Sequence, residues 1–207
     1  MQISCRDKNR IAIQGDILGG AAMGVCNVLC LTGDGVQAGD HPQAKPVFDL
    51  DSTSLLGIAR GLREEHRFES GRKITFAPRV LLGAAENPNV SPVEHRAVRL
   101  AKKISAGAQF VQTQYCYDIP LLRRFMTAVE DAGLLEQVFI LIGVGPIRTA
   151  KAGEWMRTHV PGIHIPDSVI ERMKGAKDQT REGLNLCVDL IQEVRTIKGV
   201  SGVHVMA

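Results

Sequence analysis

An acidic side chain, Asp34, stands where an apolar run of the sequence opens into a long loop. The run, residues 27–32, has no polar alternation, which is typical of a strand buried on both faces. Residues 33–46 are rich in Gly, Pro and Asp, and long ordered loops in small domains are often functional. The carboxyl ends of strands carry the site in parallel α/β proteins, so Asp34 is either a functional carboxylate or a cap of the turn.

Two amides end a second apolar segment. Gln112 and Gln114 are two positions apart, so both point to the same side of a strand, and Tyr115 follows them. Buried polar groups need partners, and an amide offers a paired donor and acceptor that can read a heterocycle. The other interpretation is that these amides cap the neighbouring backbone. It is less favoured, because both amides point to the same side.

Small residues end a third segment, at residues 83–88 with the sequence GAAENP. Small side chains at a strand end let a flat molecule approach the backbone. The same residues also suit a tight strand-to-helix turn, which the Asn-Pro pair would close. A fourth segment ends at residues 143–146, GVGP, an abrupt turn without a reactive side chain, so its expected role is shape.

The other residue types indicate little chemistry. Lys102 and Lys103 stand late in a predicted helix, where lysines complement the helix dipole. The six histidines do not stand at H-x-x-x-H or H-E-x-x-H spacing, so no metal site is expected. Neither a G-x-S-x-G elbow nor a phosphate-binding P-loop occurs in the sequence.

The composition narrows the class of protein. The chain has 207 residues, 44% hydrophobic and 23% charged, so it can bury a core and is not disordered. No apolar run approaches the roughly 20 residues of a membrane span, and the N-terminal residues do not resemble a signal peptide. A net charge of +3 with 4% aromatic residues argues against nucleic-acid binding. Five cysteines without a C-x-x-C pair fit reduced thiols in a cytoplasmic protein.

Helical and strand-like segments alternate along the chain. Apolar periodicity and capping residues predict helices over residues 9–24, 52–66, 91–105, 119–132, 167–174 and 178–197, with a further helix ending near 159. Strands are expected over residues 27–32, 73–85, 108–114, 138–143 and 202–206. Because helices separate the strands, the strands must pair in parallel through right-handed crossovers.

This alternation predicts one α/β domain over residues 1–207. Two architectures satisfy it, an open doubly wound sheet or part of a (β/α)8 barrel. A complete barrel needs eight strands and about 250 residues. The sequence predicts five strands and opens on a helix, so in the barrel case the first strands would be missing.

Six short motifs follow one another along nearly the whole chain. They are CRDKNR (5–10), NVLCLTGD (27–34), KPVFDLD (45–51), GAAENP (83–88), AGAQFVQTQ (106–114) and GVGPI (143–147). In this order they resemble the methylenetetrahydrofolate reductase family. The resemblance implies a partial (β/α)8 TIM-type barrel of about five parallel strands with outer helices, with FAD bound at the carboxyl ends of the strands.

The resemblance also implies a reaction. The family passes a hydride from NAD(P)H through FAD to 5,10-methylenetetrahydrofolate and forms 5-methyltetrahydrofolate, in one-carbon metabolism and methionine biosynthesis. Some bacterial members use ferredoxin or partner subunits instead. The expected partners of this chain are therefore a folate substrate, an NAD(P)H or ferredoxin-type donor, and either further copies of itself or a partner subunit.

Site residues are implied position by position. Asp34 matches the acid that stabilises the cationic iminium form of the folate and influences the flavin potential. Gln114 matches the amide that binds the pterin, and Tyr115 adjoins it. The positions that match cofactor contacts are Thr32, Gly33, Asp34, Phe48, Asp49, Gly83, Ala84, Asn87, Lys102 and Lys103, of which the two lysines match phosphate contacts.

The sequence departs from the family in two ways. Many members carry Arg where Thr32 stands, and members with Tyr and His at the 83–88 turn differ from Gly83 and Asn87. The family's first strand carries a glutamate proposed as general acid, and its second strand contacts the flavin; neither segment is recognised here. Two function classes follow: a flavin-dependent folate reductase, or a non-catalytic barrel remnant or subunit that binds folate or flavin and is completed by a partner.

Overall fold

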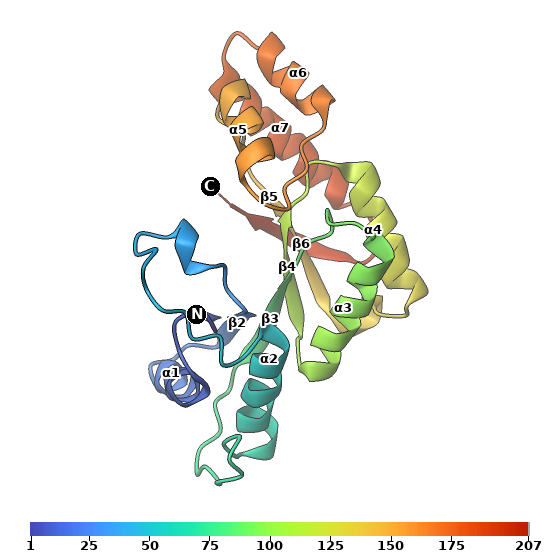
Figure 1. The fold of residues 1–207 in the computed structure, drawn as a ribbon. Coiled ribbons are helices and arrows are strands. Elements are labelled where there is room, and N and C mark those ends of the chain that lie inside the picture. Colours follow the sequence, from blue (N-terminus) through green and yellow to red (C-terminus); the bar gives the residue numbers. More distant parts are fainter. Residues whose placement is uncertain (207) are drawn as a thin grey trace. The chain divides into compact units, whose positions relative to one another are not determined.

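Helices and strands alternate in a parallel α/β fold (Figure 1). The structure is a computed structural model that describes residues 1–206. The strands are β1 (Gln2–Ser4), β2 (Asn27–Leu31), β3 (Leu81–Glu86), β4 (Phe110–Tyr115), β5 (Phe139–Val144) and β6 (Val200–Val205). The helices are α1 (Arg10–Ala22), α2 (Ser52–Arg60), α3 (Val93–Ala106), α4 (Ile119–Asp131), α5 (Ala150–His159), α6 (Asp167–Gly175) and α7 (Gln179–Val194), with shorter turns at Val36–Ala38, Gly61–Glu65 and Leu135–Gln137.

The sheet order identifies the architecture. Within residues 1–206 the strands form a six-stranded sheet in the order β1-β2-β3-β4-β5-β6. The pairs β1–β2, β2–β3 and β5–β6 are parallel. A doubly wound sheet reverses its strand order at a switch point, whereas a barrel keeps the order of the chain. The fold is therefore of the expected partial (β/α)8 type and not doubly wound.

Two expectations about strands need correction. The chain opens on a strand and not on a helix, because Gln2–Ser4 pairs in parallel with Leu29–Leu31. This strand has three residues and a single buried side chain, Ile3, so it carries no periodic signal. The strand expected over residues 73–85 begins only at Leu81, since Pro78 and the preceding turn interrupt it.

The chain divides into two compact units, which are described separately. Unit 1 comprises residues 1–85 and 101–110, and unit 2 comprises residues 86–100 and 111–206. Within residues 1–206, no helix combines the length and the apolar character that crossing a bilayer requires.

Unit 1 is built on two capped helices. Asn9 caps α1 by accepting hydrogen bonds from the backbone N–H groups of Ile11 and Ala12, each at 3.1 Å. Asp51 caps α2 by accepting from the N–H of Ser54 at 2.7 Å. The helices contact each other, α2 also contacts β2, and the core between these elements is apolar. Its fully buried side chains include Ile13, Ile17, Val28, Leu55 and Leu56.

In unit 2, α4 follows β4, and α5, α6 and α7 follow β5. Asp118 caps α4 by accepting from the N–H of Leu121 at 2.9 Å. Helix α7 contacts β5. Gly183 on α7 lies close to the segment that follows β5, because a Cβ there would overlap the backbone of Ile147. The fully buried core includes Leu122, Phe125, Ile140, Ile142 and Val194. On α5 the rings of Trp155 and His159 are stacked, with centroids 5.2 Å apart.

All five cysteines are free thiols. Cys26 is exposed, and the other four are buried. Burial raises the pKa of the Cys30 thiol to about 12 and that of Cys116 to about 12. These buried thiols are therefore protonated and unreactive near neutral pH.

Candidate functional site

The turn after β2 exposes Asp34. The hydroxyl oxygen of Thr32 accepts a hydrogen bond from the backbone N–H of Ser52 at 2.9 Å, so the turn is tied to the start of α2. Gly33 has φ +92°, and a Cβ there would overlap the side chain of Ser4. The next residue, Asp34, is exposed. Its charge helps to raise the pKa of Arg6, although the hydrogen bond from Arg6 to Asp7 is the larger cause.

A short segment before α2 exposes Phe48 and secures Asp49. Phe48 has φ +42°, which is unusual for a residue with a side chain, and it is 40% exposed. Asp49 accepts hydrogen bonds from the guanidinium and the backbone N–H of Arg10, at 2.8 and 2.9 Å. These bonds lower the pKa of Asp49 to about 2. The side chain of Asp49 is thus engaged within the chain, while the ring of Phe48 is open to solvent.

Gly83, expected at the end of a strand, lies inside β3, which continues to Glu86, and the space beside Gly83 is filled by the protein itself. Gly83 is buried, and a Cβ there would overlap the ring of Phe110. Ala84 is also completely buried. The missing side chain of Gly83 therefore makes room for Phe110, which the sequence interpretation did not foresee.

The two lysines of α3 differ in environment. Lys102 is exposed, whereas Lys103 is 6% exposed. The ammonium of Lys103 donates a hydrogen bond to the carbonyl oxygen of Ala85 at 2.5 Å. Because a buried cation must be paired, this side chain stabilises unit 1. Its match to a phosphate contact stays a prediction.

In unit 2, Gln114 keeps an unused donor. Its Oε1 accepts a hydrogen bond from the backbone N–H of Tyr115 at 3.0 Å. Its Nε2 donates no hydrogen bond to any described residue, and the side chain is partly exposed. The amide therefore offers a ligand two N–H donors and the second lone pair of its oxygen.

The tyrosine that follows Gln114 lies in an ordered aromatic pair. The rings of Tyr115 and Tyr117 are stacked, with centroids 5.6 Å apart. The hydroxyl of Tyr117 donates to the carbonyl of Gly145 at 3.1 Å, and a Cβ on Gly145 would overlap the Tyr115 ring. Burial raises the pKa of Tyr115, with a smaller contribution from Cys187. The 143–146 turn thus shapes the surroundings of Tyr115.

Asn87 and Asn89 brace the loop after β3. The Nδ2 of Asn87 donates to the carbonyl of Gly162 at 3.0 Å, and its Oδ1 accepts from the N–H of Asn89. The Nδ2 of Asn89 donates to the carbonyls of Tyr115 and Gly162, at 2.8 and 3.1 Å. Its Oδ1 is buried with no hydrogen-bond partner among the described residues. Asn87 therefore has the turn-closing role that the sequence offered as one alternative.

The model of one protein family, methylenetetrahydrofolate reductase, matches residues 1–207 of the chain. The chain belongs to the methylenetetrahydrofolate reductase family. A curated relative, methylenetetrahydrofolate reductase 2 of Schizosaccharomyces pombe, is 23% identical over 222 residues. That alignment covers 99% of this chain and 32% of the yeast protein, so the chain spans about a third of this relative's length.

A solved structure supports the fold. It is described as an uncharacterized protein from Clostridium thermocellum that binds two copies of 5-methyl-5,6,7,8-tetrahydrofolic acid. The match has a TM-score of 0.50 and 16% sequence identity, and it covers 99% of this chain and 86% of that chain. At this identity the likeness shows the shared fold alone.

The reductase family resemblance implied ten cofactor positions, and the structure separates them by environment. Asp34, Phe48 and Lys102 are exposed and offer a carboxylate, a ring and a cation. Asp49, Gly83, Asn87 and Lys103 are engaged by groups of the chain. The exposed groups are therefore accessible to a ligand. The engaged set fits the role of a support.

Sequence reasoning missed three residues that contact the predicted site residues, Arg10 and Phe110 in unit 1 and Asn89 in unit 2. Each lies far along the chain from a group that it contacts: Phe110 from Gly83, Asn89 from Tyr115, and Arg10 from Asp49. The signal for Arg10 was the CRDKNR motif, which is rich in charge directly before a helix. No local pattern marks Phe110 as the neighbour of Gly83.

Proposed function

We propose that this chain provides folate and flavin contacts of a 5,10-methylenetetrahydrofolate reductase. In this reaction FAD, when bound, carries a hydride from NAD(P)H to the folate and yields 5-methyltetrahydrofolate. The observation that carries the proposal is the family match over residues 1–207, together with the exposed carboxylate of Asp34 at the end of β2. The exposed ring of Phe48 and the unused amide donor of Gln114 support it.

Asp34 is assigned to charge stabilisation. The iminium form of the folate carries a positive charge, and a fixed carboxylate beside it lowers the energy of the state in which that charge develops. The turn holds Asp34 in place, because the two residues before it are constrained. Gly33 has a left-handed conformation, and the hydroxyl of Thr32 is hydrogen-bonded to the backbone N–H of Ser52. The same negative charge makes electron uptake by a neighbouring flavin less favourable.

Gln114 is assigned to substrate orientation. The pterin presents both donors and acceptors along one edge, and the free Nε2 of Gln114 pairs with an acceptor there. Its oxygen is held by the backbone N–H of Tyr115, so the amide is oriented before the ligand arrives. Tyr115, fixed by its stack on Tyr117, offers an adjoining aromatic surface.

The cofactor contacts are assigned to the exposed groups. Thr32, Gly33 and Asp34 lie along one turn, and Phe48 offers its ring for contact with the flavin. Lys102 is the exposed lysine of α3 and supplies a positive charge for a phosphate. The electron donor is NAD(P)H or a ferredoxin-type protein, and the reduced state of the cysteines suits a cytoplasmic setting.

Flavin and folate binding test the proposal directly. The purified chain is mixed with FAD, and a shifted visible spectrum together with quenched flavin fluorescence reports binding. Titration with 5-methyltetrahydrofolate in a calorimeter reports the folate site. Anaerobic reoxidation of the reduced complex by 5,10-methylenetetrahydrofolate, faster than that of free reduced flavin, is the expected result. Reduction is then attempted with NADH, NADPH and reduced ferredoxin in turn.

A second candidate is a non-catalytic subunit that binds folate and works with a partner. The solved relative from Clostridium thermocellum is described as binding 5-methyltetrahydrofolic acid, and this chain covers 86% of it. Strands β1 and β6 also end the sheet order, and unpaired strand edges favour association. Folate binding without flavin binding or reoxidation would select this candidate. Binding of neither ligand would reject both.

A further inference from the structure

Arg10, the first residue of α1, joins two acidic side chains. Its Nε and Nη2 donate to the two carboxylate oxygens of Asp49 at 2.8 and 3.0 Å. Its Nη1 donates to both oxygens of Glu69, at 2.7 and 2.9 Å. The guanidinium thus makes a two-nitrogen fork to Asp49 and a one-nitrogen contact to Glu69, and a lysine ammonium cannot reproduce the fork.

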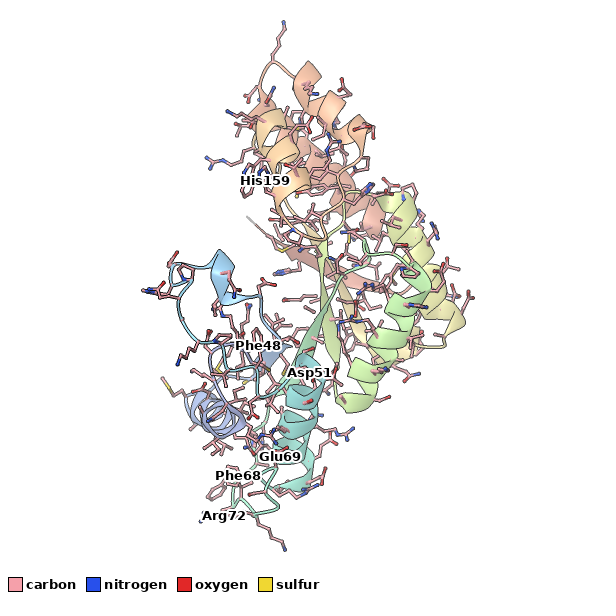
Figure 2. The ribbon with its side chains drawn as sticks, viewed as in Figure 1. Phe48, Asp51, Phe68, Glu69, Arg72 and His159 are labelled. Atoms are coloured by element: carbon pink, nitrogen blue, oxygen red, sulfur yellow. The ribbon has the colours of Figure 1, made fainter. Side chains whose placement is uncertain are left out.

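Glu69 is itself anchored to α1 at a second point. Its backbone N–H donates to Oε1 of Gln14 at 2.9 Å, and Nε2 of Gln14 donates to the carbonyl of Arg10 at 2.9 Å. Gln14 is 7% exposed, so this part of the network is buried. Figure 2 shows Phe68, Glu69 and Arg72 on a further turn, which comes after Gly61–Glu65. The network therefore ties α1 both to this turn and to the segment before α2.

The residue beside Asp49 is the exposed Phe48. The backbone N–H of Phe48 donates to the carbonyl of Cys5 at 3.1 Å, and that of Val47 donates to the carbonyl of Arg6 at 2.7 Å. The segment is thus held by backbone bonds on one side of Phe48 and by the Asp49–Arg10 contact on the other. Such anchoring is needed, because the positive φ of Phe48 is a strained conformation for a residue with a side chain.

We propose that Arg10 is a positioning residue, which holds Phe48 in its ligand-contacting conformation through Asp49 and Glu69. The inference rests on the proposed function, in which the ring of Phe48 contacts bound FAD. It changes the role of Asp49, whose carboxylate acts on Arg10 and not on the cofactor. It also assigns Glu69, which no sequence motif singled out, to the support of the same segment.

The exposure of these groups predicts where the effect appears. The side chains of Arg10, Asp49 and Glu69 are 41%, 30% and 38% exposed. Exposed ion pairs contribute little to global stability, since water screens them. Loss of the Arg10 contacts should therefore leave the unit folded. Its effect should appear locally, as disorder of the Phe48 segment.

The first experiment compares FAD affinity in matched variants. Arg10→Lys keeps the charge and removes the fork, and it should weaken FAD binding about tenfold through the lost preorganisation. Arg172→Lys is the control, because Arg172 also joins two carboxylates, Glu182 at 2.5 Å and Asp189 at 2.8 Å, in unit 2. The control should bind FAD like the parent chain. Equal affinity in Arg10→Lys and the parent would overturn the inference.

A double-mutant cycle separates positioning from direct contact. If Asp49 acts through Arg10, the losses from Arg10→Lys and Asp49→Asn are not additive, and the double variant binds FAD about as weakly as the weaker single variant. If Asp49 contacts the cofactor itself, the two losses multiply, and the positioning role of Asp49 is rejected. Glu69→Gln is a milder change and should cause a smaller loss of FAD affinity. It replaces Arg10→Lys in the comparison if that variant does not fold.

A ligand-free measurement keeps this test independent of the proposed function. Phe48 is replaced by 4-fluorophenylalanine, and its ¹⁹F signal is recorded without FAD. A single narrow signal is expected in the parent and in Arg172→Lys, with a shifted or broadened signal in Arg10→Lys. If the parent chain binds no FAD, the proposed function fails, yet the ¹⁹F comparison still decides whether Arg10 orders Phe48. An unchanged signal in Arg10→Lys would reject that ordering.

Discussion

The ring of Phe110 occupies the space that Gly83 leaves by having no side chain. Both residues are buried, Gly83 on β3 and Phe110 at the start of β4, and both belong to unit 1. A glycine inside a strand can make room for either a ligand or a neighbouring side chain. The contact with Phe110 gives this glycine a packing role.

Gly83→Ala should destabilise the chain, because the added methyl group must displace a buried ring. Overpacking of this kind costs about 1–3 kcal/mol, measurable as a lower midpoint in urea unfolding. Gly57→Ala is the matched control. Gly57 lies inside α2 with nothing within 4 Å of its Cβ position, so alanine there should stabilise by about 0.5–1 kcal/mol. The same sign in both variants would contradict the packing role of Gly83.

Lys103→Met should lower stability more than Lys102→Met. The ammonium of Lys103 is buried and donates to the carbonyl of Ala85, so its loss should cost about 1–3 kcal/mol. Lys102 is exposed, so Lys102→Met should leave the free energy of unfolding almost unchanged. FAD affinity should fall more in Lys102→Met than in Lys103→Met. The salt dependence of FAD binding should also weaken in Lys102→Met. Titrations at two salt concentrations decide between the two lysines.

Asp34→Asn should slow the folate half-reaction. The amide retains the size of the side chain and removes the charge that stabilises the developing cation, so the rate of flavin reoxidation by 5,10-methylenetetrahydrofolate should fall about tenfold or more. Asp34 is exposed, and thermal unfolding should therefore change little. Stopped-flow absorbance, with a chain or assembly that turns over, is the measurement. An unaltered rate would assign Asp34 to capping of its turn.

Gln114→Ala should chiefly raise the folate KM. The amide pairs with the pterin in the ground state and in the transition state alike, so uniform binding is lost and kcat is largely kept. Loss of one such hydrogen bond costs about 0.5–1.5 kcal/mol, or several-fold in affinity. Calorimetric titration with 5-methyltetrahydrofolate gives the same quantity without turnover. A fall in kcat at unchanged KM would point to a chemical role instead.

The order of the Phe48 segment should persist into acid. The hydrogen bonds from Arg10 lower the pKa of Asp49 to about 2, below its ordinary value of about 4. A carboxylate with a depressed folded-state pKa contributes fully above the ordinary value, and its contribution is lost as the pH falls through the folded value. The ¹⁹F signal of labelled Phe48 should therefore hold down to about pH 4 and change toward pH 2. In Asp49→Asn this acid-induced change should be smaller, because Glu69 is then the one carboxylate left on Arg10 among the residues that the network joins.

The sequence predicted the elements well where the pattern is local. Five of the strands and all of the predicted helices are present, because periodicity and capping residues such as Asn9, Asp51 and Asp118 act within a few positions. Strand β1 was missed because three residues cannot show a period. The sequential strand order, which excludes a doubly wound sheet, followed from the family resemblance and not from the periodicity.

The environment of the site residues was less predictable. By residue type Lys103 is the same as its exposed neighbour Lys102, and only contacts across many residues separate the two lysines. Burial of Lys103 depends on where the carbonyl of Ala85 lies, and the role of Asp49 depends on Arg10, 39 positions earlier. Residue types therefore indicated which chemistry was present, but not which groups were already engaged.

The uneven exposure of the cysteines makes the chain suitable for spectroscopy. Cys26, in unit 1, is the exposed thiol among the five cysteines, so a maleimide or iodoacetamide dye should attach there under native conditions. Trp155, in unit 2, is the single tryptophan and is 56% exposed. A dye on Cys26 that accepts energy from Trp155 therefore provides an optical ruler between the two units. Energy transfer recorded with and without folate would report any movement of one unit against the other in solution.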